Sequence, residues 1–266
     1  MGFSADTLRD RVAIVTGASQ GIGRATAAEL ACVGADVVVC SRRPAALKPV
    51  ADEVRAAGRR ALVVECDVAD ARHVDAVVAR TLETFGRIDL HVNNAGYRIR
   101  SPLADLPRSE WDAMIGTNLT GVFLFCQAVG RVMITQRSGT IVNVTSVAGR
   151  TGTRGMAAYA AAKAGVTVLT QSLGAEWAKY GIRVNAVAPG PVETEGVLQV
   201  WKTPAMIAQA AREVPLGRLG RPQEIAWAVV FVASDHASFM TGETLYVSGG
   251  PRVGNREDQS GVTTAP

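Results

Sequence analysis

Short, continuous runs of apolar residues alternate along this chain with longer segments that mix apolar and polar positions. The runs are rich in valine and isoleucine and predict strands at residues 12–16, 36–40, 61–66, 88–92, 140–144, 182–188 and 244–247. The longer segments predict helices at residues 21–34, 44–57, 71–85, 109–136, 157–180 and 222–233. Continuous runs are typical of strands buried on both faces, and strands separated by helices form a parallel sheet. The pattern therefore predicts an α/β fold, with a doubly wound parallel sheet of about seven strands in a three-layer α/β/α sandwich.

The same pattern predicts the extent of the ordered domain. No stretch rich in proline, glycine or serine interrupts residues 1–250, so we expect a single domain there. Residues 194–213 are less regular and are expected to hold one or two short helices. Residues 251–266 contain no leucine, isoleucine or aromatic residue, so this polar tail cannot form a core of its own.

Composition and charge narrow the class of protein. The 266 residues are 48% hydrophobic and carry a net charge of +4. The longest apolar run, 225–233, is far shorter than the ~20 residues that a membrane helix needs, and no signal peptide is recognisable. No run of Lys and Arg exceeds two residues, which favours a solvated surface over a nucleic-acid interface. Four widely spaced cysteines and three scattered histidines complete the prediction of a cytoplasmic protein without a metal site, a membrane contact or a nucleic-acid partner.

A glycine-rich turn joins the first predicted strand to the first helix. Gly17, Gly21 and Gly23 have the spacing Gly-x3-Gly-x-Gly. Glycines at such a turn let the backbone approach a pyrophosphate, which then lies at the positive end of the helix. A purely structural turn is the alternative, but the strand before and the helix after favour a dinucleotide site. The other residues expected to line it are Ser19, Gln20 and Ile22.

The end of the second strand bears on which dinucleotide is bound. An acidic residue there would hold the ribose hydroxyls of NAD, whereas this chain has Ser41, Arg42 and Arg43. The guanidinium fork of arginine matches the geometry of a 2′-phosphate. These could be two solvated arginines, but their position favours NADP (NADPH) as the preferred cofactor, with NAD possible.

Candidate catalytic residues follow the fourth and fifth strands. Residues 93–96 read Asn-Asn-Ala-Gly, and Ser146 follows the fifth strand. Tyr159 and Lys163 are four residues apart and share one face of the predicted helix. An ammonium group near a phenol favours the phenolate and lowers the phenol pKa. The pair is therefore a candidate general acid and base.

Together these motifs resemble the classical short-chain dehydrogenase/reductase family over about residues 11–250, and the family implies a Rossmann fold. The resemblance implies that Tyr159 donates a proton to a carbonyl oxygen, that Ser146 positions this oxygen, and that Lys163 binds the nicotinamide ribose and lowers the Tyr159 pKa. Asn118 would anchor a water molecule. The remaining residues that the resemblance assigns to the cofactor are Asp67, Val68, Asn94, Ala95, Gly96, Pro189, Gly190, Val192 and Thr194.

The resemblance also implies a function. It predicts an NAD(P)-dependent oxidoreductase that interconverts a carbonyl and a secondary alcohol, with a substrate lid at about residues 194–215 and a homotetrameric assembly. NADPH-dependent reduction of a ketone or a 3-oxoacyl thioester is favoured over a polyol or gluconate dehydrogenase. A module that binds a dinucleotide without catalysis is the alternative from another class. Arg98, Arg100 and Arg154 lie in the loops expected beside the substrate and are either an anion-binding group or solvated charge.

Overall fold

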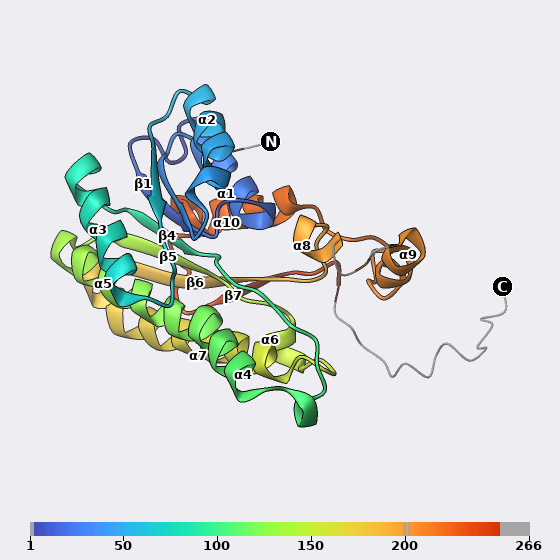
Figure 1. Ribbon diagram of the computed structural model, residues 1–266. Coiled ribbons are helices and arrows are strands. Elements are labelled where there is room, and N and C mark those ends of the chain that lie inside the picture. Colours follow the sequence, from blue (N-terminus) through green and yellow to red (C-terminus); the bar gives the residue numbers. More distant parts are fainter. Residues whose placement is uncertain (1–2, 199–200, 202, 251–266) are drawn as a thin grey trace.

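The computed structural model describes residues 3–198, 201 and 203–250, so the polar tail predicted at 251–266 lies outside the described residues. Seven parallel strands form one sheet in the order β3-β2-β1-β4-β5-β6-β7 (Figure 1). The strands are β1 (Val12–Thr16), β2 (Asp36–Ser41), β3 (Ala61–Glu65), β4 (Leu90–Asn93), β5 (Gly139–Val144), β6 (Ile182–Pro189) and β7 (Thr244–Val247). Every residue of β1, β4 and β5 is buried, as their continuous apolar runs predict.

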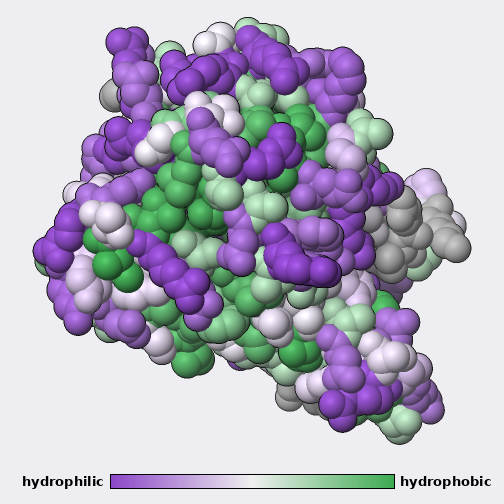
Figure 2. Space-filling model, turned by 60° about the vertical axis from the view of Figure 1, so that its left-hand side comes forward, coloured by the Kyte–Doolittle hydropathy of each residue, from purple (hydrophilic) through white to green (hydrophobic). Residues whose placement is uncertain are grey.

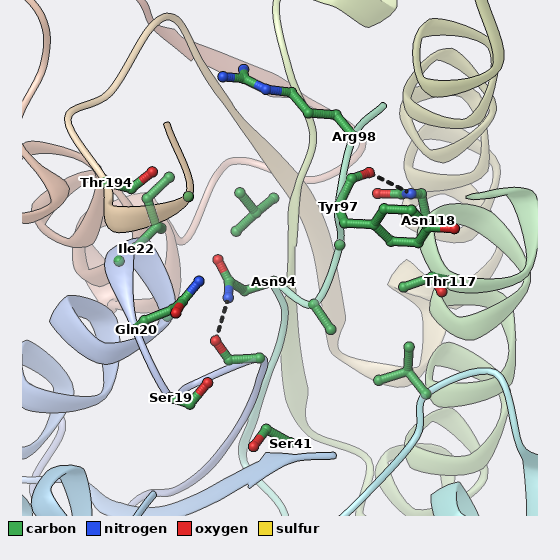
Figure 3. A pocket seen from close by; sticks show the side chains of 18 of the residues that line it. Ser19, Gln20, Ile22, Ser41, Asn94, Tyr97, Arg98, Thr117, Asn118 and Thr194 are labelled. Atoms are coloured by element: carbon green, nitrogen blue, oxygen red, sulfur yellow. Dashed lines mark hydrogen bonds between the residues drawn. The ribbon is translucent and has the colours of Figure 1, made fainter. Parts of the chain in front are cut away.

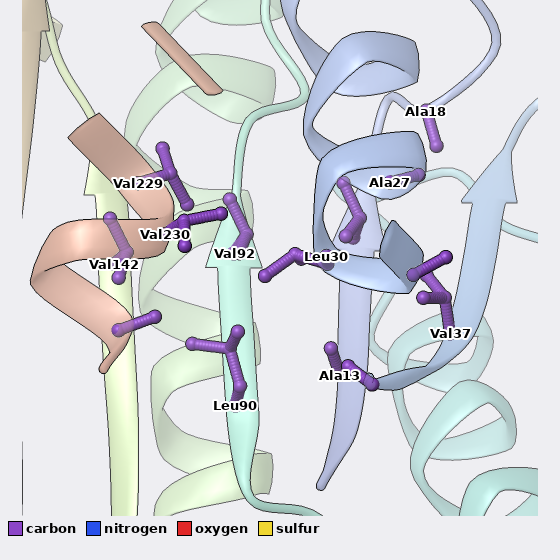
Figure 4. Packing of buried hydrophobic residues seen from close by; sticks show 14 of the residues in the cluster. Ala13, Ala18, Ala27, Leu30, Val37, Leu90, Val92, Val142, Val229 and Val230 are labelled. Atoms are coloured by element: carbon purple, nitrogen blue, oxygen red, sulfur yellow. The ribbon is translucent and has the colours of Figure 1, made fainter. Parts of the chain in front are cut away.

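Helices cover both faces of this sheet and give the predicted three layers. They are α1 (Gly21–Cys32), α2 (Lys48–Ala56), α3 (Ala71–Phe85), α4 (Arg108–Ile115), α5 (Gly121–Gln136), α6 (Ala148–Thr151), α7 (Ala157–Trp177), α8 (Glu195–Leu198), α9 (Pro204–Arg212) and α10 (Pro222–Ala233). Buried residues of α1, α2 and α10 pack on one face, as Leu30 and Val229 illustrate (Figure 4). Those of α3, α5 and α7 pack on the other. The doubly wound α/β fold is therefore confirmed.

The strand order places the functional cleft. β1 pairs with β2 on one side and with β4 on the other, so the chain reverses its direction of winding between β1 and β4. In open α/β sheets, ligands bind beyond the carboxyl ends of the strands at such a reversal. The two loops that leave β1 and β4 are therefore the expected walls of a ligand site.

The helix predicted at 109–136 differs from the expectation in one respect. It comprises α4 and α5, joined by a π-helical segment, Gly116–Thr120. By length and mean hydropathy the run Arg108–Gln136 could cross a membrane, but 44% of its most apolar window is buried inside the protein. Phe125, Val129 and Met133 of α5 are fully buried in the core, which is the behaviour of a core helix.

Candidate active site

A cavity of about 470 Å³ lies beyond the carboxyl ends of β1 and β4 (Figure 3). Its volume is typical of a cofactor site. All of the cofactor and catalytic residues predicted from the sequence line it, although they come from points between Gly17 and Thr194. Two further lining residues, Thr117 and Val144, belong to no motif or loop predicted from the sequence, although each lies one or two residues from a predicted site residue.

The glycine-rich turn is shaped by backbone geometry. Gly17 and Gly21 have φ values of 63° and 55°, in the left-handed region that favours glycine. A Cβ on Gly23 would collide with the carbonyl oxygen of Gly17 and the side-chain nitrogen of Asn94. No side chain caps the start of α1 at Gln20, so the first backbone N–H groups of the helix remain available.

Thr16 and Asn94 hold this turn against the end of β4. The side-chain nitrogen of Asn94 donates to the carbonyl oxygens of Thr16 and Gly17, at 2.9 and 3.2 Å. The Thr16 hydroxyl accepts from the backbone N–H groups of Asn94 and Ala95, at 2.9 and 3.0 Å. Six groups from two distant loops are thereby fixed, so the turn is formed before any ligand binds.

The cavity continues to the end of β2. Arg42 and Arg43 are exposed there, and neither guanidinium forms a hydrogen bond or an ion pair within the part of the chain that the structure describes. On the opposite wall, the Asp67 carboxylate accepts from the backbone N–H of Ala69 at 3.0 Å, and Val68 is buried. This end of the cavity therefore offers two unpaired cations beside a small apolar wall.

The other end of the cavity holds the candidate catalytic residues. Ser146 follows β5, its hydroxyl accepts from the backbone N–H of Ala148 at 3.2 Å, and it is close enough to the Tyr159 phenol to lower the phenol pKa. Lys163 is 4% exposed, and its Nζ donates to the carbonyl oxygen of Val144 at 2.8 Å. The same nitrogen lies 5.8 Å from the centroid of the Tyr159 ring. The sequence placed Tyr159 and Lys163 together, and the fold adds Ser146 to them.

Burial controls the pKa values of this pair. It lowers the pKa of Lys163 to about 8 and raises the pKa of Tyr159 above its usual value of 10. The Ser146 hydroxyl and the charge of Arg98 oppose the rise at Tyr159 without overcoming it. The expectation that Lys163 lowers the Tyr159 pKa is therefore wrong for the chain by itself, because the ammonium group is bonded to Val144 and both side chains are desolvated.

Asn118 lies in the π-helical segment and is fully buried. Its side-chain nitrogen donates to the carbonyl oxygens of Tyr97 and Met114, at 2.9 and 3.0 Å. Its Oδ1 atom has no partner among the described residues. Since a buried acceptor without a partner is costly, this oxygen is a ready site for a water molecule or a ligand hydroxyl.

Comparisons with known proteins identify the family. The family model described as enoyl-(acyl carrier protein) reductase matches residues 17–251. A 3-oxoacyl-[acyl-carrier-protein] reductase from Synechocystis sp. is 44% identical over 245 residues, which are 91% of this chain and 97% of that protein. The short-chain reductase protein NovJ from Streptomyces niveus is 42% identical over 247 residues, 91% and 94% of the two chains. The chain belongs to the short-chain dehydrogenase/reductase family.

A solved structure agrees with this assignment. The crystal structure of a short-chain type dehydrogenase/reductase from Mycobacterium marinum matches with a TM-score of 0.87 and 36% identity, covering 92% of this chain and 97% of that one. The predicted family and Rossmann fold are thus confirmed, and the chain is an NAD(P)-dependent oxidoreductase of this family. The alternative of a binding module without catalysis is set aside.

Proposed function

We propose that this chain is an NADPH-dependent reductase of 3-oxoacyl thioesters, with Tyr159 as the proton donor. The observation that carries the proposal is that Ser146 and Tyr159 line the same cavity as the glycine turn at Gly17, Gly21 and Gly23. Two hydrogen-bonding hydroxyls beside a dinucleotide site suit a reaction in which a carbonyl oxygen gains a proton.

The residues of the cavity fit a nicotinamide dinucleotide. The turn at Gly17, Gly21 and Gly23 presents backbone rather than side chains, as a diphosphate needs. The remaining contacts would come from Ser19, Gln20, Ile22, Ser41, Arg42, Arg43, Asp67, Val68, Asn94, Ala95, Gly96, Pro189, Gly190, Val192 and Thr194. When bound, the cofactor supplies the hydride for carbonyl reduction.

The proton follows from the side chains. Tyr159 holds it on its phenol oxygen, since its raised pKa keeps the phenol protonated at neutral pH. Ser146 orients the substrate carbonyl towards this phenol. Lys163 and the unpartnered Oδ1 of Asn118 both adjoin Gly96, where a Cβ would lie 3.6 Å from Lys163 Nζ. A water molecule on Asn118 would let Lys163 replace the proton that Tyr159 gives up.

The preference for NADPH rests on Arg42. Its guanidinium has no partner among the described residues and lines the cavity at the end of β2. A 2′-phosphate would supply the missing anion, and the ribose hydroxyl of NADH would not.

Acyl thioesters are favoured over polyols and gluconate by the relatives and by the lid. The matching model and the Synechocystis relative are both named for acyl carrier protein substrates, one with a C=C bond and one with a C=O bond. We favour the carbonyl, because two hydroxyl groups in one cavity, those of Ser146 and Tyr159, suit an oxygen that gains a proton. In the proposed lid, residues 194–215, Val197 lines the cavity and Trp201 lies near Arg98, so apolar side chains adjoin the substrate end. Residues 199, 200 and 202 lie outside the described residues.

A substrate panel tests this proposal directly. Oxidation of NADPH and of NADH would be followed with acetoacetyl-CoA and with crotonyl-CoA, and reduction of NADP with gluconate and a polyol. We expect acetoacetyl-CoA with NADPH to be the most efficient pair. Faster turnover of crotonyl-CoA would assign enoyl reduction instead, and faster oxidation of gluconate would assign the polyol class.

The same proposal includes a cytoplasmic homotetramer, built on one domain spanning residues 1–250. Phe123 of α5 and Val168 of α7 are 45% and 59% exposed. Figure 2 shows apolar surface on the face that includes the α3–α5 side of Figure 1. Burial of such helices between subunits would remove this surface from water. Light scattering at micromolar concentration should give four times the mass of the chain, and a monomer mass would contradict the assembly.

A further inference from the structure

Arg98 is an unpaired cation at the substrate end of the cavity. It follows Gly96 by two residues in the loop after β4 and lines the same cavity as Ser146 and Tyr159. Figure 3 shows its side chain extending from the Tyr97 side of the cavity towards the side on which Thr194 lies. Within the described residues, its guanidinium forms neither a hydrogen bond nor an ion pair, so its N–H donors are free for a ligand.

Trp201 supports this guanidinium from the proposed lid. The Cζ atom of Arg98 lies 6.0 Å from the centroid of the Trp201 ring. A cation–π contact of this kind uses no N–H donor as a hydrogen bond and leaves the N–H groups free to donate. Arg98 is therefore held by an aromatic contact that does not consume its hydrogen-bonding capacity.

The charge of Arg98 reaches the reacting centre. It is one of the groups that lower the pKa of Tyr159 against the larger effect of burial. Arg98 and Tyr159 line one cavity, and Arg98 follows Gly96, which adjoins Lys163, so a substrate group on Arg98 would lie a few bonds from the carbonyl that Tyr159 protonates. The phosphate of a phosphopantetheine arm is too remote from that carbonyl to be this group.

The other two arginines of the predicted group are placed differently. All three arginines are exposed, but Arg100 and Arg154 are not among the residues that line the cavity. The guanidinium of Arg100 instead approaches the Met156 sulfur at 4.0 Å. The sequence suggested one cluster of three cations, whereas the fold separates Arg98 from the others.

We propose that Arg98 is a specificity-determining residue that donates hydrogen bonds to a second substrate oxygen, two carbons from the carbonyl being reduced. This inference rests on the proposed function. A thioester carbonyl and a carboxylate both provide such an oxygen in a 3-oxo compound, and a plain ketone does not. Arg98 would thus select 3-oxo substrates over simple ketones, while Ser146 and Tyr159 act on the reacting oxygen alone.

Three substrates separate these possibilities. The S-acetoacetyl thioester of N-acetylcysteamine carries the second oxygen without charge or phosphate, acetoacetate carries it as a carboxylate, and 2-pentanone lacks it. The wild type, Arg98→Gln, Arg98→Lys and the charge-matched control Arg154→Gln would be compared by kcat/KM with NADPH. Thermal melting and the Kd for NADPH would show that each variant folds and binds cofactor.

Arg98→Gln should lower kcat/KM roughly 10- to 100-fold for the two 3-oxo compounds, the usual value of a charge-assisted hydrogen bond. Its effect on 2-pentanone should be small. Arg98→Lys should restore kcat/KM for acetoacetate more than for the thioester, because lysine keeps the positive charge but lacks the planar guanidinium. Arg154→Gln should match the wild type on all three. Loss on acetoacetate alone would identify the carboxylate as the group that Arg98 binds.

Two outcomes refute different statements. In the first outcome, the wild type reduces the 3-oxo compounds, but Arg98→Gln slows all three substrates equally or slows none. Arg98 then does not bind a second substrate oxygen, and the proposed function stands. If the wild type reduces neither 3-oxo compound, the proposed function fails and this inference fails with it.

Discussion

The two ends of the cavity are formed by different kinds of chemical group. The nucleotide end consists of backbone, glycines and exposed arginines, and its shape is fixed by the Thr16–Asn94 hydrogen bonds. The catalytic end consists of polar side chains that follow β5 or belong to the π-helical segment and α7, with Asn118 and Lys163 buried. Burial shifts the pKa values of Tyr159 and Lys163. The first end can bind an anion without any buried charge, whereas the second keeps an ammonium group out of water.

Because of this difference, we expect the affinity for the cofactor and the pH dependence of turnover to be controlled by separate parts of the molecule. Changes at the nucleotide end should alter cofactor binding and leave the pH dependence alone. Changes at the catalytic end should alter turnover and the response to pH, with little effect on cofactor selectivity. The four predictions below test this division, beginning with the largest expected effect.

Tyr159→Phe should lower turnover about 10²- to 10⁴-fold, because it removes the transferable proton and keeps the ring. The Kd for NADPH, measured by fluorescence, should stay close to that of the wild type. Tyr180→Phe, near the far end of α7, is the control and should keep full turnover. Near-normal turnover in Tyr159→Phe would show that another group gives the proton.

Arg42→Ala should weaken NADPH binding roughly 10- to 100-fold, since a charge-assisted contact contributes about 1.5–3 kcal/mol. NADH serves as the internal control, because it lacks the 2′-phosphate. Titration of the variant and the wild type with each cofactor gives the ratio of the Kd for NADPH to the Kd for NADH. Equal losses for NADPH and NADH would remove the basis for the proposed preference.

Lys163→Met should abolish most activity and raise the melting temperature at pH 7 by a few degrees. The pKa of Lys163 is about 8 in the folded chain, below the value of 10.5 for an exposed lysine. Below pH 8 the buried ammonium group is charged, and its burial lowers the free energy of unfolding. This penalty disappears as pH rises from 8 to 10.5. The gain in the variant should therefore shrink over that range, and melting curves at pH 7 and 10 would show it. A gain independent of pH would mean that packing, and not charge, is responsible.

His91 should make the protein sensitive to mild acid. Burial lowers its pKa to about 4, and it stacks on Phe125 with 4.7 Å between ring centroids. Its Nε2 bonds Asn93, and the network continues through Asn143 to Thr170 of α7. The stabilising contribution of neutral His91 is present above pH 6.5 and is lost as pH falls towards 4.

His91→Gln, which keeps a side-chain donor, should flatten the fall of the melting temperature between pH 6.5 and 4.5. His73, on the exposed side of α3, is the matched control, and His73→Gln should leave that slope unchanged. If the melting temperature of His91→Gln falls with pH as steeply as that of the wild type, carboxylates and not His91 cause the acid sensitivity.

The sequence by itself determined the fold and the membership of the site. Valine-rich runs must be buried wherever they occur, and the glycine spacing permits a tight turn within seven residues, so both signals are local. Tyr159 and Lys163 could be paired because four residues on one helix share a face. The family resemblance supplied Asn118 and Ser146, whose positions depend on other elements.

Only the tertiary structure determined the burial, the hydrogen-bond partners and the pKa shifts of the site residues. The π-helical segment, the unpartnered Asn118 Oδ1 and the direction of the Tyr159 pKa shift depend on burial by segments far apart in the chain. The sequence grouped Arg98 with Arg100 and Arg154, and only the fold separates them. Desolvation depends on every atom around a group, so it cannot be read from the spacing of residues along the chain.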